Sequence, residues 1–175
     1  MSNLRLIKQS SLTTAVSSFN VTDVFNDDFD VYKVQINGVS TDGTTYGDTS
    51  LRLINSSGSL LSDSNYCYGY NFMAPNTSYT SEYSTSSTSF YRALAYFTDQ
   101  APETQFATFY FYNPARSSCY TYIGGQSGAA YGGIFRFNKY FGIYKSNASA
   151  TGIQISASQS ISSGDIKIYG LGVDT

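Results

Sequence analysis

The side chains of this sequence that could perform chemistry are its carboxylates, because the 175 residues include 12 Asp and Glu but no His. Hydrolysis of a glycosidic bond needs two carboxyl groups that face each other across a cleft. The candidates for such a pair are Asp27, Asp28, Asp30, Asp99 and Glu103. Their spacing singles out no two of them, so the sequence predicts no catalytic pair.

Nucleophilic catalysis is not indicated either. Ser-His-Asp, Cys-His and HExxH zinc chemistry all need histidine, which the chain does not contain. A Ser-Lys nucleophile needs a desolvated lysine beside the serine. Lys145 and Ser146 are adjacent in the sequence, but adjacent residues of a strand face opposite sides. We therefore predict that the chain is not an enzyme and has no catalytic residues.

Metal ligands are equally sparse. Oxygen ligands for a hard cation such as calcium are densest in NDDFD, at Asn26–Asp30, but their spacing matches no EF-hand loop. We interpret this run as a solvated turn before the strand DVYKV. The two cysteines, Cys67 and Cys119, are too few for a zinc site. They form one disulfide if adjacent strands bring them together, or they stay free thiols in a reducing cytoplasm. We predict no metal site and no cofactor.

Aromatic rings are the side chains that remain for recognition, since the chain has 17 Tyr and 12 Phe but no Trp. A domain of this size cannot place all of these large rings inside, so some of them must face a partner or a ligand. Seven tyrosines are the candidate interface or ligand contacts: Tyr66, Tyr68, Tyr70, Tyr79, Tyr83, Tyr110 and Tyr112. The alternative for each of them is a place in a core that has few other large side chains.

The segments SNYCYGYNF and FYFYN repeat tyrosine with a period of two. This period puts Tyr66, Tyr68 and Tyr70 on one face of a strand, and Tyr110 and Tyr112 on one face of another. The other two candidates lie in the Ser- and Thr-rich run NTSYTSEYSTSSTS, which has no apolar side chain to bury apart from its tyrosines. We predict a surface loop here, either a plain one or a contact surface for a subunit or ligand.

The composition excludes several classes of partner. Charged residues make up 13% of the chain, about half of the usual share, and the net charge is −2. Such a chain does not attract nucleic acid or anionic lipid over a long range. No apolar run reaches the ~18 residues of a membrane span, and the start MSNLRLIKQSSLTT has no apolar run of the length of a secretory leader. We expect no nucleic acid partner, no membrane and no leader.

The elements that must position these side chains are strands. Short segments with period-two alternation, such as DVYKVQING, FYFYN and ATGIQISAS, follow one another between glycine, proline and Asn/Asp/Ser clusters. No stretch of useful length has a helical period, so the sequence predicts an all-β antiparallel sandwich or barrel over residues 26–175. Residues 1–25 favour β-structure but contain few clear turn signals, and we predict a first strand or an arm exchanged with a neighbouring subunit. The glycine-rich run YIGGQSGAAYGGIF is interpreted as bulges and turns between strands.

Four motifs occur in a recognisable order. The entry strand is FNDDFDVYKVQI at Phe25–Ile36, and the closing strand is GDIKIYGL at Gly164–Leu171. Between them stand LRLINSSGS and ATGIQISAS. In this order the motifs resemble a group of structural proteins of tailed bacteriophages, marine phages in particular. We expect the isoleucines of the last two motifs to lie in the core, and we interpret the closing strand as one that pairs between two others and locks the end of the chain.

The resemblance implies a jelly-roll-like antiparallel β-sandwich on a virion, assembled in the host cytoplasm and often trimeric. It favours a capsid decoration protein, as a cement protein or a head fibre. The alternative is a tail or fibre-tip adhesin that binds a host surface glycan. The implied partners are further copies of the chain, most simply in a homotrimer, and capsid or tail proteins of the same particle. Self-association also agrees with 17% aromatic and 13% charged residues, because interface cores are rich in Tyr and Phe and poor in charge.

Overall fold

The computed structural model describes residues 2–42, 47–74, 79–95, 105–131 and 134–173, and these residues form strands, turns and bends without any helix. The strands are β1 (Ser2–Leu12), β2 (Val16–Val21), β3 (Val31–Thr41), β4 (Thr49–Ile54), β5 (Tyr66–Met73), β6 (Thr80–Ser87), β7 (Phe90–Tyr91), β8 (Gln105–Tyr112), β9 (Thr121–Tyr131), β10 (Ile134–Tyr144) and β11 (Gly152–Val173). All of their pairings are antiparallel. The predicted all-β antiparallel class is therefore confirmed. In this described part of the chain no helix is long and apolar enough to span a membrane.

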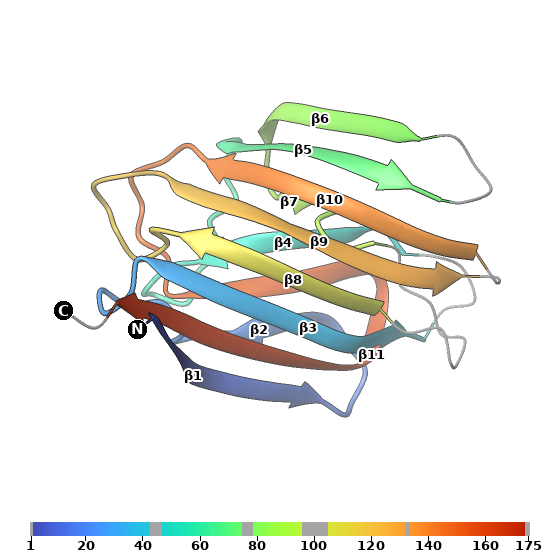
Figure 1. Cartoon of the computed structure of the whole chain (residues 1–175), viewed down its shortest axis with the longest axis horizontal. Coiled ribbons are helices and arrows are strands. Elements are labelled where there is room, and N and C mark those ends of the chain that lie inside the picture. Colours follow the sequence, from blue (N-terminus) through green and yellow to red (C-terminus); the bar gives the residue numbers. More distant parts are fainter. Residues whose placement is uncertain (1, 43–46, 75–78, 96–104, 132–133, 174–175) are drawn as a thin grey trace.

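One sheet folds back on itself to make two layers. The hydrogen-bonded order is β6-β5-β10-β9-β8-β3-β11-β4-β7, and β1 and β2 also pair with β11. Figure 1 shows a front layer that runs from β6 to β1, with β2, β4 and β7 behind it. The sheet thus comes close to a closed barrel. The finer jelly-roll arrangement stays a prediction.

The strand β11 belongs to both layers. Its first part pairs with β2 and β4, where Ile153 lies opposite both Val21 and Leu53. Its last part pairs with β1 and β3, where Ile168 lies opposite both Lys8 and Val34. Register shifts between these two parts mark the place where the strand passes from one layer to the other. The closing strand was predicted to pair between two others, and this prediction is confirmed. The strands predicted in ATGIQISAS and GDIKIYGL are, however, parts of the one continuous strand β11.

The core lies between the layers. Four of the five isoleucines of β11, namely Ile153, Ile155, Ile166 and Ile168, were predicted to be buried, and at most 1% of each is exposed, which confirms the prediction. The β3 side chains that alternate toward the core are fully buried as well. Large aromatic side chains fill the other half of the core, chiefly Tyr66, Tyr140, Tyr144, Phe90, Phe109 and Phe111. Tyrosine takes the place that leucine often holds in such cores, and the buried hydroxyl of Tyr66 bonds to the backbone of Leu53 and Leu61.

Two sequence predictions are wrong for the part of each segment that the structure describes. Within the Ser- and Thr-rich run, residues 76–78 lie outside the described residues, but Thr80–Ser87 form strand β6 and not a loop. This strand pairs with β5 at the end of the sheet, and its exposed side chains need no apolar alternation because neither of its faces is covered. In the glycine-rich run, Gly124 and Gly125 make neither turn nor bulge, because they lie inside the regular pairing of β9, whereas Gly132 and Gly133 lie outside the described residues. A Cβ at Gly125 would come within 2.6 Å of Phe109 Cδ1, so this glycine allows close packing.

The N-terminal residues form β1 and β2, and both strands pair with β11 of the same chain. The side chains of Leu4 and Leu6 on β1 are 51% and 50% exposed. Among the described strands β1 pairs with β11 alone, so its other edge is open. Exchange of this segment with a neighbouring subunit stays a prediction.

Several tyrosines, among them Tyr144 and Tyr91, have a pKa above the ordinary value because burial disfavours the phenolate. The Tyr144 hydroxyl donates a hydrogen bond to Asp63 Oδ1 at 2.7 Å. Burial, together with that hydrogen bond, raises the pKa of Tyr144 to about 12. Burial and a hydrogen bond to Asp48 likewise raise the pKa of Tyr91 to about 12. In both cases the neutral phenol is the form that the fold accommodates.

Substitution of Ile168 by Asp is expected to prevent folding. Ile168 is fully buried between the layers, and an unpaired carboxylate there costs several kcal/mol, against a total stability of about 5–15 kcal/mol. The matched control is Lys167→Glu, on the opposite face of the same strand, which should fold. Urea unfolding and the yield of soluble protein are the measurements. A native-like Ile168→Asp protein would show that the centre of β11 does not hold the fold together.

We expect the protein to lose stability between about pH 10 and pH 12. Unfolded tyrosines release their protons near pH 10, whereas the folded pKa of Tyr91 and Tyr144 is about 12. The stabilisation by these raised pKa values is complete below pH 10 and is lost as the pH rises through the folded pKa. Urea unfolding at a series of alkaline pH values measures this slope, and Tyr144→Phe should make it shallower. Constant stability across this window would contradict the assignment.

Candidate functional site

Among the described residues, the candidate carboxylates and thiols are not gathered into a catalytic or metal site. Asp99 and Glu103 lie outside the described residues. Asp27 belongs to the predicted turn before β3, and Asp30 is paired with Arg116 at 2.5 Å. Within the described ranges no three His, Cys, Asp or Glu side chains form a group that could hold a metal ion. Both cysteines are free thiols.

Three of the seven candidate tyrosines share the inner face of β5. Tyr66 is fully buried, and its hydroxyl accepts a hydrogen bond from Leu53 N at 3.0 Å and donates one to Leu61 O at 2.6 Å. Tyr70 is 4% exposed. Tyr68 is half-buried and stacks on Tyr70, with ring centroids 6.3 Å apart. These rings therefore pack inside the fold, and Tyr66 is a core residue.

The other four candidates lie on the outside. Tyr79 and Tyr83 are 59% and 82% exposed, and Tyr83 projects from the edge strand β6. Tyr112 is 42% exposed, and Tyr110 is half-buried. The last two lie on β8, in the middle of the front layer (Figure 1), on the face that points away from the core.

The strand register aligns aromatic residues and glycines in one row across five neighbouring strands. Tyr110 of β8 lies opposite Gly124 of β9, which lies opposite Phe141 of β10. Phe141 lies opposite Gly69 of β5, and Gly69 lies opposite Tyr83 of β6. Directly opposed residues point to the same face of a sheet. We call these five residues the aromatic–glycine row.

The two glycines of this row differ in what lies above them. The ring of Phe141 covers Gly69, because a Cβ at Gly69 would come within 2.9 Å of Phe141 Cζ. Above Gly124 there is open space, with no atom within 4 Å of the position of a Cβ. Gly124 is therefore the floor of a groove whose walls carry Tyr110 and Phe141. The groove has a volume of about 750 Å³.

Phe141, which is 65% exposed, also lines a second hollow of about 360 Å³. Tyr83 and Tyr122 contribute to this second hollow, and Tyr122 is 47% exposed. Because Phe141 lines both hollows, its ring stands between them. The two hollows together form an aromatic surface that spans β8, β9, β10, β5 and β6.

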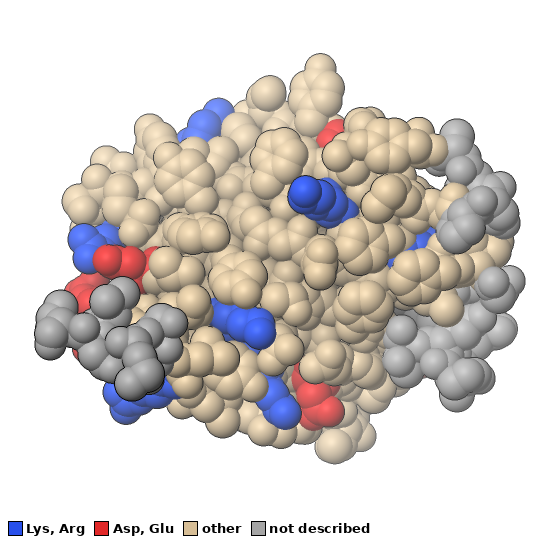
Figure 2. Space-filling view, viewed as in Figure 1, with Lys and Arg blue, Asp and Glu red and all other residues tan. Residues whose placement is uncertain are grey.

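A polar row runs beside the aromatic–glycine row, two residues along each strand. It consists of Thr108, Gln126, Lys139, Asn71 and Ser81, which lie opposite one another in that order. Four of these side chains are neutral donors or acceptors, and Ser81 Oγ donates to Asn71 Oδ1 at 3.0 Å. Figure 2 shows that this face of the molecule is mostly uncharged, with isolated basic and acidic side chains. The surface thus combines apolar rings with neutral hydrogen-bonding groups.

Sequence reasoning found Tyr110 and Tyr83 but missed Phe141, Gly124 and Gly69. The tyrosines were visible because they repeat with a period of two. The missing members are not distinguished by any local pattern, since their role depends on which residues of the neighbouring strands lie opposite them. The only signal was that glycine pairs and aromatic clusters alternate along the chain.

Comparison with known proteins gives no family. No family model matches the chain, and no curated protein matches it. Among solved structures the chain is similar to the CBM2 module of the evolved Dit protein of Lactobacillus casei BL23 phage J-1. The similarity covers 97% of this chain and 78% of that one, with 10% identity and a TM-score of 0.23. A TM-score of 0.23 is too low to establish a common fold, so function has to be argued from the geometry.

Proposed function

We propose that this chain is a structural protein of a bacteriophage particle that binds a carbohydrate on the outer face of its front layer. The observation that carries the proposal is the open floor at Gly124 between Tyr110 and Phe141, beside a row of neutral polar side chains. The four ordered motifs of the sequence support a place on a phage particle.

The chemistry of the two rows is complementary to a sugar ring. A pyranose has apolar C–H faces and a rim of hydroxyl groups, so it needs an apolar platform together with hydrogen-bonding groups at the side. Exposed aromatic rings provide such a platform, and amides and hydroxyls provide the donors and acceptors. Both rows are built on paired strands, so little conformational freedom is lost when a ligand binds.

Binding without turnover is part of the proposal. The described lining of the groove contains Lys139 as its charged side chain and contains no carboxylate. Glycoside hydrolysis needs a carboxyl pair at the bound sugar. The chain therefore holds its ligand and leaves it intact.

A second role, capsid decoration, is favoured by the open edge of β1. Leu4 and Leu6 are half exposed on this edge. An open strand edge with apolar side chains is suited to pairing with a strand of another chain. The occupant of this edge is then a second copy of the chain, as in a homotrimer, or a coat protein. The β1 edge lies at the opposite end of the front layer from β6 (Figure 1), so one protein can have both roles.

The glycan proposal is tested by calorimetric titration with a panel of neutral bacterial surface polysaccharides and their oligosaccharides. Phe141→Ala should weaken binding of the preferred glycan at least tenfold, because it removes the ring between the two hollows. Gly124→Val should do the same, because its side chain fills the open floor. The control is Phe135→Ala, which removes a 47% exposed ring of the same strand that does not line the groove.

Both substitutions in the groove lie at exposed or open positions, and thermal unfolding should show that they leave the fold intact. The proposal fails if no neutral glycan of the panel binds. It also fails if Phe135→Ala weakens binding as much as Phe141→Ala does.

A further inference from the structure

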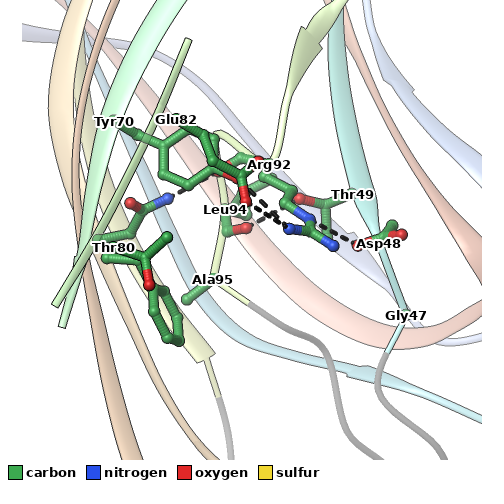
Figure 3. A pocket seen from close by; sticks show the side chains of 11 residues that line it. Gly47, Asp48, Thr49, Tyr70, Thr80, Glu82, Arg92, Leu94 and Ala95 are labelled. Atoms are coloured by element: carbon green, nitrogen blue, oxygen red, sulfur yellow. Dashed lines mark hydrogen bonds and ion pairs between the residues drawn. The ribbon is translucent and has the colours of Figure 1, made fainter. Parts of the chain in front are cut away.

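A further, smaller cavity lies on the inner side of the fold, away from the aromatic–glycine row. It has a volume of about 140 Å³ and lies where β4 and the segment after β7 face β5 and β6. Figure 3 shows Asp48, Arg92, Glu82 and Tyr70 gathered at this cavity, with Leu94 beside them. A cavity of about 150 Å³ holds a molecule of the size of benzene, which is the size of the bare ring of a sugar.

The backbone holds Arg92 in a strained conformation at this cavity. Arg92 has a φ of 52°, in the left-handed region that residues with a side chain rarely adopt. Two hydrogen bonds keep it there: Arg92 N donates to Thr49 O at 2.8 Å, and Asn138 Nδ2 donates to Arg92 O at 2.7 Å. Strain that neighbouring groups maintain in this way is typical of binding and functional sites.

The segment that follows, residues 93–95, is fixed by buried polar side chains instead of by a strand partner. Ser127 Oγ donates to Ala93 O at 3.1 Å and accepts from Ala95 N at 2.8 Å. Thr49 Oγ1 donates to Leu94 O at 2.9 Å, and Gln105 Nε2 donates to Ala95 O. These hydrogen bonds hold in place the segment that forms one wall of the cavity.

The charges at the cavity sum to a formal −1. Arg92 Nε contacts Asp48 Oδ1 at 2.8 Å, and Arg92 Nη1 contacts Glu82 Oε1 at 3.5 Å. The Tyr70 hydroxyl donates to Glu82 Oε2 at 2.5 Å. Two carboxylates against one guanidinium disfavour an anionic ligand and favour one that brings hydrogen-bond donors.

One acceptor of the cavity lining has no partner. Asn138 is 2% exposed, and its Oδ1 accepts no hydrogen bond from the described residues. Leaving a buried acceptor unsatisfied costs about 1–3 kcal/mol, so such groups call for a ligand or a water. Asn138 Nδ2 already binds the Arg92 carbonyl, which fixes the amide at the cavity wall.

We propose that this cavity binds a single sugar ring through its hydroxyl groups. The hydroxyls donate to Asp48, Glu82 and Asn138 Oδ1, and the apolar side of the ring packs on Leu94. Neighbouring hydroxyls of a sugar ring suit the two carboxylates, because hydrogen bonds to an ionised acceptor are the stronger ones. This site is independent of the groove on the outer face.

The test uses the full chain and four probes: D-glucose, D-galactose, L-rhamnose and N-acetyl-D-glucosamine. We expect at least one of them to bind saturably in calorimetric titration. Glu82→Gln and Asp48→Asn keep the side-chain shape but lose the ionised acceptor, and each should weaken that binding at least tenfold. The matched control is Asp27→Asn, an exposed carboxylate in the turn before β3, which should leave the affinity unchanged.

The unaltered protein gives a second readout that does not depend on the folding of any variant. The side-chain amide resonances of Asn138 should shift on addition of the sugar that binds, and should not shift with the same concentration of glycerol. The proposal is overturned if none of the four sugars binds saturably, if Glu82→Gln binds as tightly as the unaltered chain, or if the Asn138 resonances do not respond. A cavity that holds water alone gives the first and third of these results.

Discussion

The backbone pairing of β11 with four other strands holds the two layers of this protein together. One end of β11 hydrogen-bonds to β2 and β4, and the other end to β1 and β3. The buried isoleucines of this strand then pack between layers whose relative position the strand itself sets. From β3 the register passes to β8, β9, β10, β5 and β6 through a continuous series of pairings. The alignment of side chains on the outer face thus depends on packing at the inner face. If one strand shifted its pairing by one residue, every side chain of that strand would move to the opposite face of the sheet.

The proposed recognition surface on the outer face depends on this register. The two adjacent glycines of β9 are needed for different reasons: on the inner face Gly125 makes room for Phe109 in the core, and on the outer face Gly124 leaves the floor of the groove open. Exposed rings such as Phe141 and Tyr122 have an energetic cost in water, and monomeric proteins rarely gather them on one surface without a partner. The same strands therefore pack in the core with one face and present the other face to the proposed ligand.

The sequence was sufficient for the class of fold and for part of the core. Period-two alternation placed the side chains of β3 correctly, and it placed the isoleucines of β11 as well. The same period could not tell which face of a strand is the inner one. Tyr66 and Tyr110 were therefore both predicted as candidate contacts, although Tyr66 is buried and Tyr110 lines the groove. Strand β6 was missed because its pairing with β5 depends on backbone hydrogen bonds, which leave no apolar pattern. The aromatic–glycine row and the Arg92 cavity both arise from contacts between distant segments, which no local pattern reports.

The central claim is that a carbohydrate lies over Gly124, between Tyr110 and Phe141. Its most direct test is aromatic side-chain NMR of protein labelled with ¹³C in Phe and Tyr, recorded with and without a neutral glycan that the protein binds. The account predicts that the ring resonances of Tyr110 and Phe141 shift on binding, whereas those of the buried Tyr66 and Phe109 do not. Shifts confined to rings outside the groove, or no shift of Phe141 at saturating glycan, would contradict it.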